Sequence, residues 1–236
     1  MASSALPDTP SAFGAADWTT IAPYYEDLAG RHLDDVRSWL EEWSSLEDMV
    51  QEAGQLALIA YTTDTTDEER ERVYLRWVSE VEPQLSDHRV RLARRLVESG
   101  WSDPELETVL RRMRNQIGLF RDENLPLEAE LSRLEAGYQK ITGSMSVEWD
   151  GETLTVPQAQ ARLGDADRGV RERAYLLYLQ PYIDARDELA GVFDEMLRLR
   201  QRIARNAGFS NYRDYAHQQK ARFDYTPDDC LTPWSR

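Results

Sequence analysis

The side chains that could bind a metal are few and widely spaced in this sequence. The chain has three histidines, His32, His88 and His217, and one cysteine, Cys230. A zinc site of the His-Glu-x-x-His type needs two histidines on one helical face, with a glutamate beside the metal-bound water. No segment has that spacing, and one cysteine forms neither an internal disulfide nor a cysteine-based zinc cluster. We therefore assign no catalytic residue, no metal-ligating residue and no particular substrate-binding residue to this chain.

Asp214 and His217 are the strongest remaining pair, because residues three apart share one face of a helix. A carboxylate-bundle metal site needs Glu-x-x-His on two helices and further carboxylates. The sequence has no matching second element. A surface or helix-capping role is the favoured interpretation for both residues.

Two other groups of residues, one rich in arginine and one in aromatic side chains, could form binding surfaces. The first is an arginine-rich stretch that could bind phosphate but lies among acidic residues, so an ion-paired, solvated face is favoured. It comprises Arg198, Arg200, Arg202 and Arg205. The second is an aromatic cluster that could line a peptide groove, although aromatic residues at helical spacing are more often core. It comprises Phe209, Tyr212, Tyr215, Phe223 and Tyr225.

The charge balance excludes several classes of partner. The 236 residues include 43 acidic and 28 basic ones, which gives a formal net charge of -15. Such a field repels polyanions, so nucleic acid is an unsuitable main partner. No window approaches the roughly 20 apolar residues of a membrane span, and the first residues lack the basic and apolar segments of a secretion signal. With one cysteine, the composition fits a reducing cytoplasm.

Apolar residues at three- and four-residue steps predict long helices that must position any site. One runs from Leu33 to Tyr61, and a second begins with a capping box of Thr66 and Glu69, continues through a kink at Pro83 and stops at Gly100. These two should form an antiparallel hairpin. Further helices are predicted from Asp103-Pro104, over 127–141, from Asp165 to Asn206 with a kink at Pro181, and over 211–218.

A change to an alternating pattern predicts a β-hairpin over about 145–156. Asp150-Gly151 supplies a two-residue turn that would pair Val147 with Leu154 and Met145 with Val156, with a helix over their shared face. The fold class is therefore all-α, a long-helix bundle with one small β-hairpin. Thr226-Pro227-Asp228-Asp229 signals another helix start, yet the last residues, 231–236, are atypical and cannot continue it. We expect a longer protein that has been truncated or frameshifted here.

Several segments together resemble one family. They are Thr62-Thr63-Asp64-Thr65-Thr66, Leu119-Phe120-Arg121-Asp122-Glu123-Asn124-Leu125-Pro126-Leu127, the hairpin from Ile141 to Gly151, Ile203 to Tyr215, and Arg222 to Cys230. In this order they resemble the oligoendopeptidase F branch of the thimet-oligopeptidase-like zinc peptidases, in its N-terminal half only. The resemblance spans nearly all of residues 18–230.

The resemblance implies a largely helical, bowl-like fold whose channel admits short peptides, with zinc held by His-Glu-x-x-His and a downstream glutamate. Those residues belong to a C-terminal catalytic half that this sequence does not contain, so none is carried over. The chain alone should be inactive and bind no zinc, and its partners would be short peptides and the missing half. The alternatives are a non-catalytic helical adaptor or a relic of such a peptidase.

The expected organisation has four parts. Residues 1–17 form a mobile tail, residues 18–121 an N-terminal helical domain, and residues 122–230 a helical region with the β-hairpin that begins the peptidase catalytic fold. Residues 231–236 form the atypical end. The coding sequence beyond codon 230 separates the alternatives, because a downstream His-Glu-x-x-His would favour the peptidase.

Overall fold

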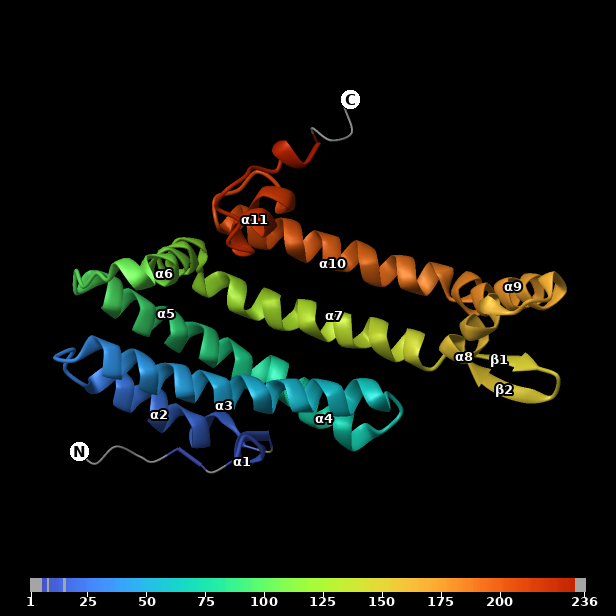
Figure 1. The fold of residues 1–236 in the computed structure, drawn as a ribbon, viewed down its shortest axis with the longest axis horizontal. Helices are drawn as coiled ribbons and strands as arrows, with labels where there is room; N and C mark the ends of the chain where they lie inside the picture. The colour runs from blue at the N-terminus through green and yellow to red at the C-terminus, as the bar shows by residue number, and fades with distance from the viewer. Residues whose placement is uncertain (1–5, 8, 15, 232–236) are drawn as a thin grey trace.

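The computed structural model describes residues 6–7, 9–14 and 16–231, and it confirms the all-α fold class with one small hairpin (Figure 1). The α-helices are α1 Ser11–Gly14, α2 Trp18–Gly30, α3 Val36–Thr63, α4 Glu68–Arg76, α5 Glu82–Glu98, α6 Glu107–Leu119, α7 Leu125–Gly143, α8 Val156–Ala161, α9 Arg168–Asp184, α10 Arg186–Asn206 and α11 Tyr212–Gln219. Short 3-10 turns span Pro104–Leu106, Asp122–Asn124 and Arg162–Gly164. None of the helices in this part of the chain combines the length and apolar composition that a membrane crossing requires.

The helices form a layered, elongated body (Figure 1). Helices α2 to α5 make one layer, and α7 and α10 pack against each other alongside it. The hairpin, α8 and α9 lie together at one end, whereas α6 and α11 lie near the other. The two ends are thus joined by the long α7–α10 pair.

The main core lies among α1 to α6. Its largest fully buried side chains include Tyr25, Leu46, Leu85, Leu92 and Leu110. Glu47 lies at its edge and accepts hydrogen bonds from the Tyr25 hydroxyl at 2.8 Å, Trp43 Nε1 at 3.1 Å and Arg89 Nε at 2.8 Å. These partners compensate the cost of removing the carboxylate from water.

A smaller core joins α6 and α7 to α10 and α11. It consists of buried Leu119, Ile203, Ala204, Ala207 and Tyr215. Leu119 is the last residue of α6. This second core positions the C-terminal segment on α6 and α7.

The β-hairpin has the predicted turn and register. Strand β1, Ser146–Trp149, pairs antiparallel with β2, Glu152–Thr155, and Val147 faces Leu154. Asp150 and Gly151 have φ values of 52° and 87°. Positive φ at both positions gives a two-residue turn whose twist matches the twist of the flanking strands. The predicted pair of Met145 and Val156 is not part of the ladder, because Thr155 caps α8 and Val156 is already helical.

The structure corrects the start of the second long helix and the nature of its internal irregularity. The second long helix is capped by Asp67, whose carboxylate accepts from the amides of Glu69 and Arg70, and not by Thr66. Its irregularity is a π-helical turn, Trp77–Val81, which ends two residues before Pro83. There the Trp77 ring lies against Gly54, where a Cβ would stand 2.6 Å from Nε1.

The predicted single helix from Asp165 to Asn206 is wrong, because the chain forms α9 and α10 with a break at Ala185. Asp167 and not Asp165 caps α9, through a 2.6 Å bond from the Gly169 amide. Pro181 cannot donate the next helical hydrogen bond, which weakens the last turn of α9. Ala185 then has φ -88° and ψ 6°, outside the helical region.

Burial differs from the sequence prediction at several positions. Phe13 lies in the segment expected to be a mobile tail, yet it is 1% exposed and contacts Tyr24 edge-on. Conversely, the apolar side chains of Leu56 and Ile59 on α3 and of Ile183 on α9 are exposed, although apolar residues at helical spacing predict a buried face. The division of the chain into four parts stays a prediction.

Candidate functional site

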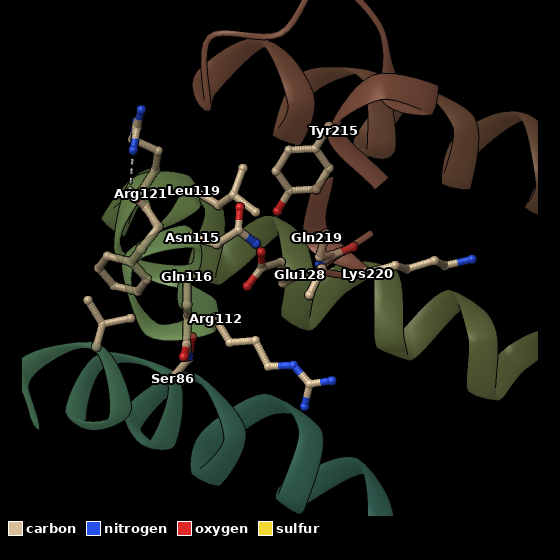
Figure 2. Close-up of a pocket in the computed structure, with 13 residues that line it drawn as sticks. Ser86, Arg112, Asn115, Gln116, Leu119, Arg121, Glu128, Tyr215, Gln219 and Lys220 are labelled. Atoms are coloured by element: carbon tan, nitrogen blue, oxygen red, sulfur yellow. Dashed lines mark hydrogen bonds between the residues drawn. The ribbon is translucent and has the colours of Figure 1, made fainter. Parts of the chain in front are cut away.

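A pocket of about 510 Å³ lies where α5, α6, α7 and α11 meet, and it is the candidate functional site (Figure 2). Its polar lining includes Ser86, Arg112, Asn115, Glu128, Tyr215 and Lys220. Val90, Leu119 and Phe120 supply its apolar wall. The size is typical of small-ligand sites, which combine apolar walls with a few convergent polar groups.

Contacts between α6 and the C-terminal segment form one side of the pocket. Asn115 Nδ2 donates to the carbonyl of Gln218 at 2.8 Å. The Arg111 guanidinium lies 4.2 Å from the centre of the Phe223 ring. These contacts hold α11 over α6 although the two are about a hundred residues apart in sequence.

Asn124 fixes the start of α7, the helix that supplies Glu128. Its side chain is 2% exposed, and Nδ2 donates to the Ile203 carbonyl at 3.1 Å. Asn206 Nδ2 donates to Asn124 Oδ1 at 2.8 Å, and Arg121 Nε donates to the Asn206 carbonyl at 3.1 Å. The first turn of α7 is therefore tied to the end of α10.

Glu128 lies in that first turn and faces the pocket (Figure 2). Burial, and next the negative charge of Glu82, raise the pKa of the Glu128 carboxyl to about 7. The structure gives this carboxylate no hydrogen bond or ion pair with any of the residues it describes. A half-buried carboxylate without a partner loses part of its hydration, so this group is unusual in the fold.

Tyr215 lies across the pocket from Glu128 (Figure 2). The residue is 3% exposed, and its ring contacts Phe209 edge-on and Tyr212 at an angle. Burial, and next the Glu128 carboxylate, raise the pKa of Tyr215 to about 12. The phenol therefore stays protonated near neutral pH.

The predicted pair Asp214 and His217 lies on α11, and its carboxylate serves the local structure. Asp214 accepts from Arg213 Nε at 2.8 Å and Asn211 Nδ2 at 2.9 Å, and these bonds hold its pKa below the usual range. His217 contacts the Tyr225 ring, and its buried Nε2 has no hydrogen-bond partner among the described residues. Across the described part of the chain, no three histidine, cysteine, aspartate or glutamate side chains converge as metal ligands.

The other two histidines are separate from the pocket. His32 is exposed. His88 is buried on α5, where Nε2 lies 2.9 Å from a Glu26 carboxylate oxygen and Nδ1 lies 3.0 Å from the Gln84 carbonyl oxygen. Both ring nitrogens of His88 thus have polar partners outside the pocket.

The arginine-rich stretch and the aromatic cluster agree with their favoured interpretations only in part. Arg198 pairs with Glu195, and Arg200 pairs with Glu135 at 3.2 Å, as an ion-paired face predicts. Tyr215 is core, whereas Tyr225 is 43% exposed. Glu128 was not predicted as a site residue, because an acidic residue in a first helical turn has the ordinary explanation of favourable interaction with the helix dipole.

Comparisons with known proteins agree with this architecture. The family model of the Peptidase M3 N-terminal domain matches residues 15–114. Among curated proteins, none matches the chain. The predicted resemblance to the N-terminal half of oligoendopeptidase F and its relatives is confirmed by this match and by the solved structures that share the fold.

Three solved structures are similar over 91% of this chain. PZ peptidase A, solved with an inhibitor, has a TM-score of 0.83 at 18% identity, over 40% of its own chain. A protein assigned as oligoendopeptidase F has a TM-score of 0.81 at 22% identity, over 39% of its chain. Another so assigned, from Bacillus anthracis str. Ames, has a TM-score of 0.82 at 16% identity, over 41% of its chain. The chain thus spans about 40% of the length of these proteins.

Proposed function

We propose that this chain forms the N-terminal helical part of a zinc-dependent oligopeptidase, where it contributes to the wall of a channel that admits short peptides. The observation that supports this most strongly is the similarity of 91% of the chain to 40% of PZ peptidase A, at a TM-score of 0.83. The match of residues 15–114 to the Peptidase M3 N-terminal domain agrees with it. The alternative of a non-catalytic adaptor or relic has no observation in its favour.

The described residues do not fit zinc. They include no converging group of three metal-ligating side chains, and the whole sequence lacks His-Glu-x-x-His. Hydrolysis would therefore depend on a catalytic part that supplies the metal and the base that activates water. The role proposed for this chain is to bind and exclude peptides by shape, without taking part in bond cleavage.

Exposed apolar residues on α9 and α10 suggest where a catalytic part would pack. Leu176 and Ile183 on α9, and Phe193 and Leu197 on α10, are all more than two-fifths exposed. Such side chains gain free energy when another surface covers them. We name these four residues the α9–α10 apolar set and propose that it contacts the catalytic part.

An expression experiment tests this function. The coding DNA that follows this chain is sequenced, and the longer product is assayed with an internally quenched peptide. The proposal expects a downstream His-Glu-x-x-His, chelator-sensitive cleavage by the longer product, and loss of cleavage when the glutamate of that motif is replaced by glutamine. A following sequence without the motif, or an inactive zinc-loaded product, would contradict the proposal.

The chain itself provides the matched control. It should cleave no quenched peptide above background with or without added zinc, and elemental analysis after a chelator rinse should find no stoichiometric zinc. One tightly held zinc per chain would direct attention to His217 and Asp214.

A further inference from the structure

We propose that the pocket between α5, α6, α7 and α11 binds a primary ammonium group, with the Glu128 carboxylate as its counter-ion and the Tyr215 hydroxyl as a second acceptor. This inference goes beyond the peptidase proposal and does not depend on it. It begins from the absence of any hydrogen bond or ion pair to Glu128 within the described residues, in a pocket of about 510 Å³.

The charged groups around the pocket do not neutralise Glu128. Glu82, at the start of α5, is a like charge and pairs with Arg89 at 2.7 Å. Arg112 on α6 and Lys220 after α11 line the pocket, but neither forms an ion pair with Glu128 in the structure. Figure 2 shows the Lys220 chain extending away from the carboxylate.

Arg121 is the remaining cation in the lining, and its guanidinium is used elsewhere. It donates to the carbonyl oxygens of Asn206 at 3.1 Å, Gly118 at 3.0 Å and Phe120 at 2.6 Å. Among the described residues, the pocket therefore holds one half-buried carboxylate without an ion pair and a protonated phenol, which Arg121 affects only through its charge. A positively charged ligand would supply the counter-ion that Glu128 lacks among the described residues.

The arrangement favours an ammonium group over a metal ion. The described residues contain no set of three carboxylate, histidine or cysteine ligands, as a divalent cation would require. An ammonium group instead donates three hydrogen bonds and needs only acceptors. Glu128 and Tyr215 supply two kinds of acceptor, and the amide of Asn115, which lies beside them in Figure 2, has a carbonyl oxygen for a third.

The apolar wall limits the ligand to an organic amine. Val90, Leu119 and Phe120 can contact carbon atoms attached to the ammonium group, which a bare ion lacks. A peptide amino terminus and a lysine side chain both offer this chemistry. The test must therefore distinguish an α-ammonium from an ε-ammonium group.

Binding of three small probes to the full chain tests the proposal. The probes are alanyl-alanine amide, which has a free α-ammonium group, N-acetyl-lysine amide, which has only the ε-ammonium group, and N-acetyl-alanyl-alanine amide, which has neither. Calorimetry at pH 7.5 and pH 5.5 should show binding of one or both ammonium probes, and weaker binding at pH 5.5; at the higher pH most of the α-amino group is still protonated. At the lower pH, Glu128 is protonated, because its pKa lies near 7.

Glu128→Gln should weaken ammonium binding roughly tenfold or more, since a charge-assisted hydrogen bond is lost. Glu130→Gln is the matched control, because Glu130 lies on the same helix, exposed and paired with Arg133 at 2.9 Å. Tyr215→Phe should produce a smaller loss, and circular dichroism verifies that each variant is folded. The proposal is overturned if neither ammonium probe binds at millimolar concentration, if the acetylated dipeptide amide binds equally well, or if Glu128→Gln binds like the unmodified chain. Each of these outcomes leaves the hydrolysis assay of the peptidase proposal unaffected.

Discussion

The Tyr61 hydroxyl donates a 2.7 Å hydrogen bond to the Ala136 carbonyl oxygen, 75 residues further along the chain, in a fully buried setting. Tyr61 ends the buried face of α3, and Ala136 lies in the middle of α7. The bond therefore joins the segment that matches the Peptidase M3 N-terminal domain, residues 15–114, to the helices that follow it. The Tyr61 ring also stacks on Tyr74, with 5.2 Å between centroids.

Replacing Tyr61 with phenylalanine should lower the free energy of unfolding by about 1 kcal/mol, because one buried hydrogen bond is lost while the ring remains. Urea denaturation measures the change. Tyr138→Phe on α7 is the control, since Tyr138 is 46% exposed and should change stability little. Equal effects of the two substitutions would show that the Tyr61 bond contributes nothing specific.

Replacing Arg89 with methionine should cost about 3 kcal/mol of stability, because it leaves a buried carboxylate unpaired. Arg89 contacts Glu47 at 2.8 Å and Glu82 at 2.7 Å, and its side chain is 18% exposed. Adding Glu47→Gln should restore part of the loss. Arg198→Met breaks an exposed pair with Glu195 and should change stability by less than about 0.5 kcal/mol.

Replacing Gly151 with valine should destabilise the hairpin by at least about 1 kcal/mol, because a β-branched residue is strained at positive φ. Gly151 has φ 87° in the Asp150-Gly151 turn. Amide hydrogen exchange over 146–155 detects the loss even if the hairpin opens locally. Gly137→Ala within α7 should instead stabilise by about 0.5–1 kcal/mol, since, apart from the adjacent residues and the backbone of α7 itself, no atom lies within 4 Å of the added Cβ. A hairpin unaffected by valine would exclude this turn geometry.

The sequence predicts the fold well where the signal is local. Helical periodicity locates α3, α5 and α7, and Asp150-Gly151 sets the register of the strands. Pro181 predicts an irregularity in this region, but the sequence does not show that the helix ends at Ala185, where no glycine or proline stands. Asp165 and Asp167 are equally good caps by residue type, so only the structure identifies the one that is used.

The pocket was less predictable than the fold because its residues are distant in sequence. Glu128 and Tyr215 belong to α7 and α11, and no motif links them. Their proximity depends on Asn124, Leu119 and Ile203, which pack α10 and α11 onto the ends of α6 and α7. A pattern within one helix contains no information on such packing.

Stability should depend on pH through Glu128. Its pKa is about 7 in the folded chain and about 4.5 as the reference, so between these values the folded state binds more protons than the unfolded state. Stability therefore falls as pH rises through this window. Glu128→Gln should match the unmodified chain near pH 4.5 and exceed it at pH 8 by on the order of 2 kcal/mol, whereas Glu130→Gln should follow the unmodified chain throughout. Parallel stability profiles for Glu128→Gln and the unmodified chain would contradict the raised pKa of this carboxyl.

The α9–α10 apolar set should make the isolated chain bind a hydrophobic dye and self-associate. Phe193 is 58% exposed and lies four residues from Leu197, so both project from one side of α10. Introducing glutamate at both positions should reduce dye fluorescence and shift the chain toward monomer in analytical ultracentrifugation, because charge at an apolar contact opposes association.

The matched control introduces glutamate at Leu56 and Ile59 on α3, which are 46% and 56% exposed. It adds the same charge to a similar area of apolar surface on another helix, so general electrostatic repulsion affects both variants equally. If only the α10 variant loses dye binding and association, the contact surface includes α10. If the two variants behave alike, the effect is due to net charge, and α10 has no special role in covering this part of the fold.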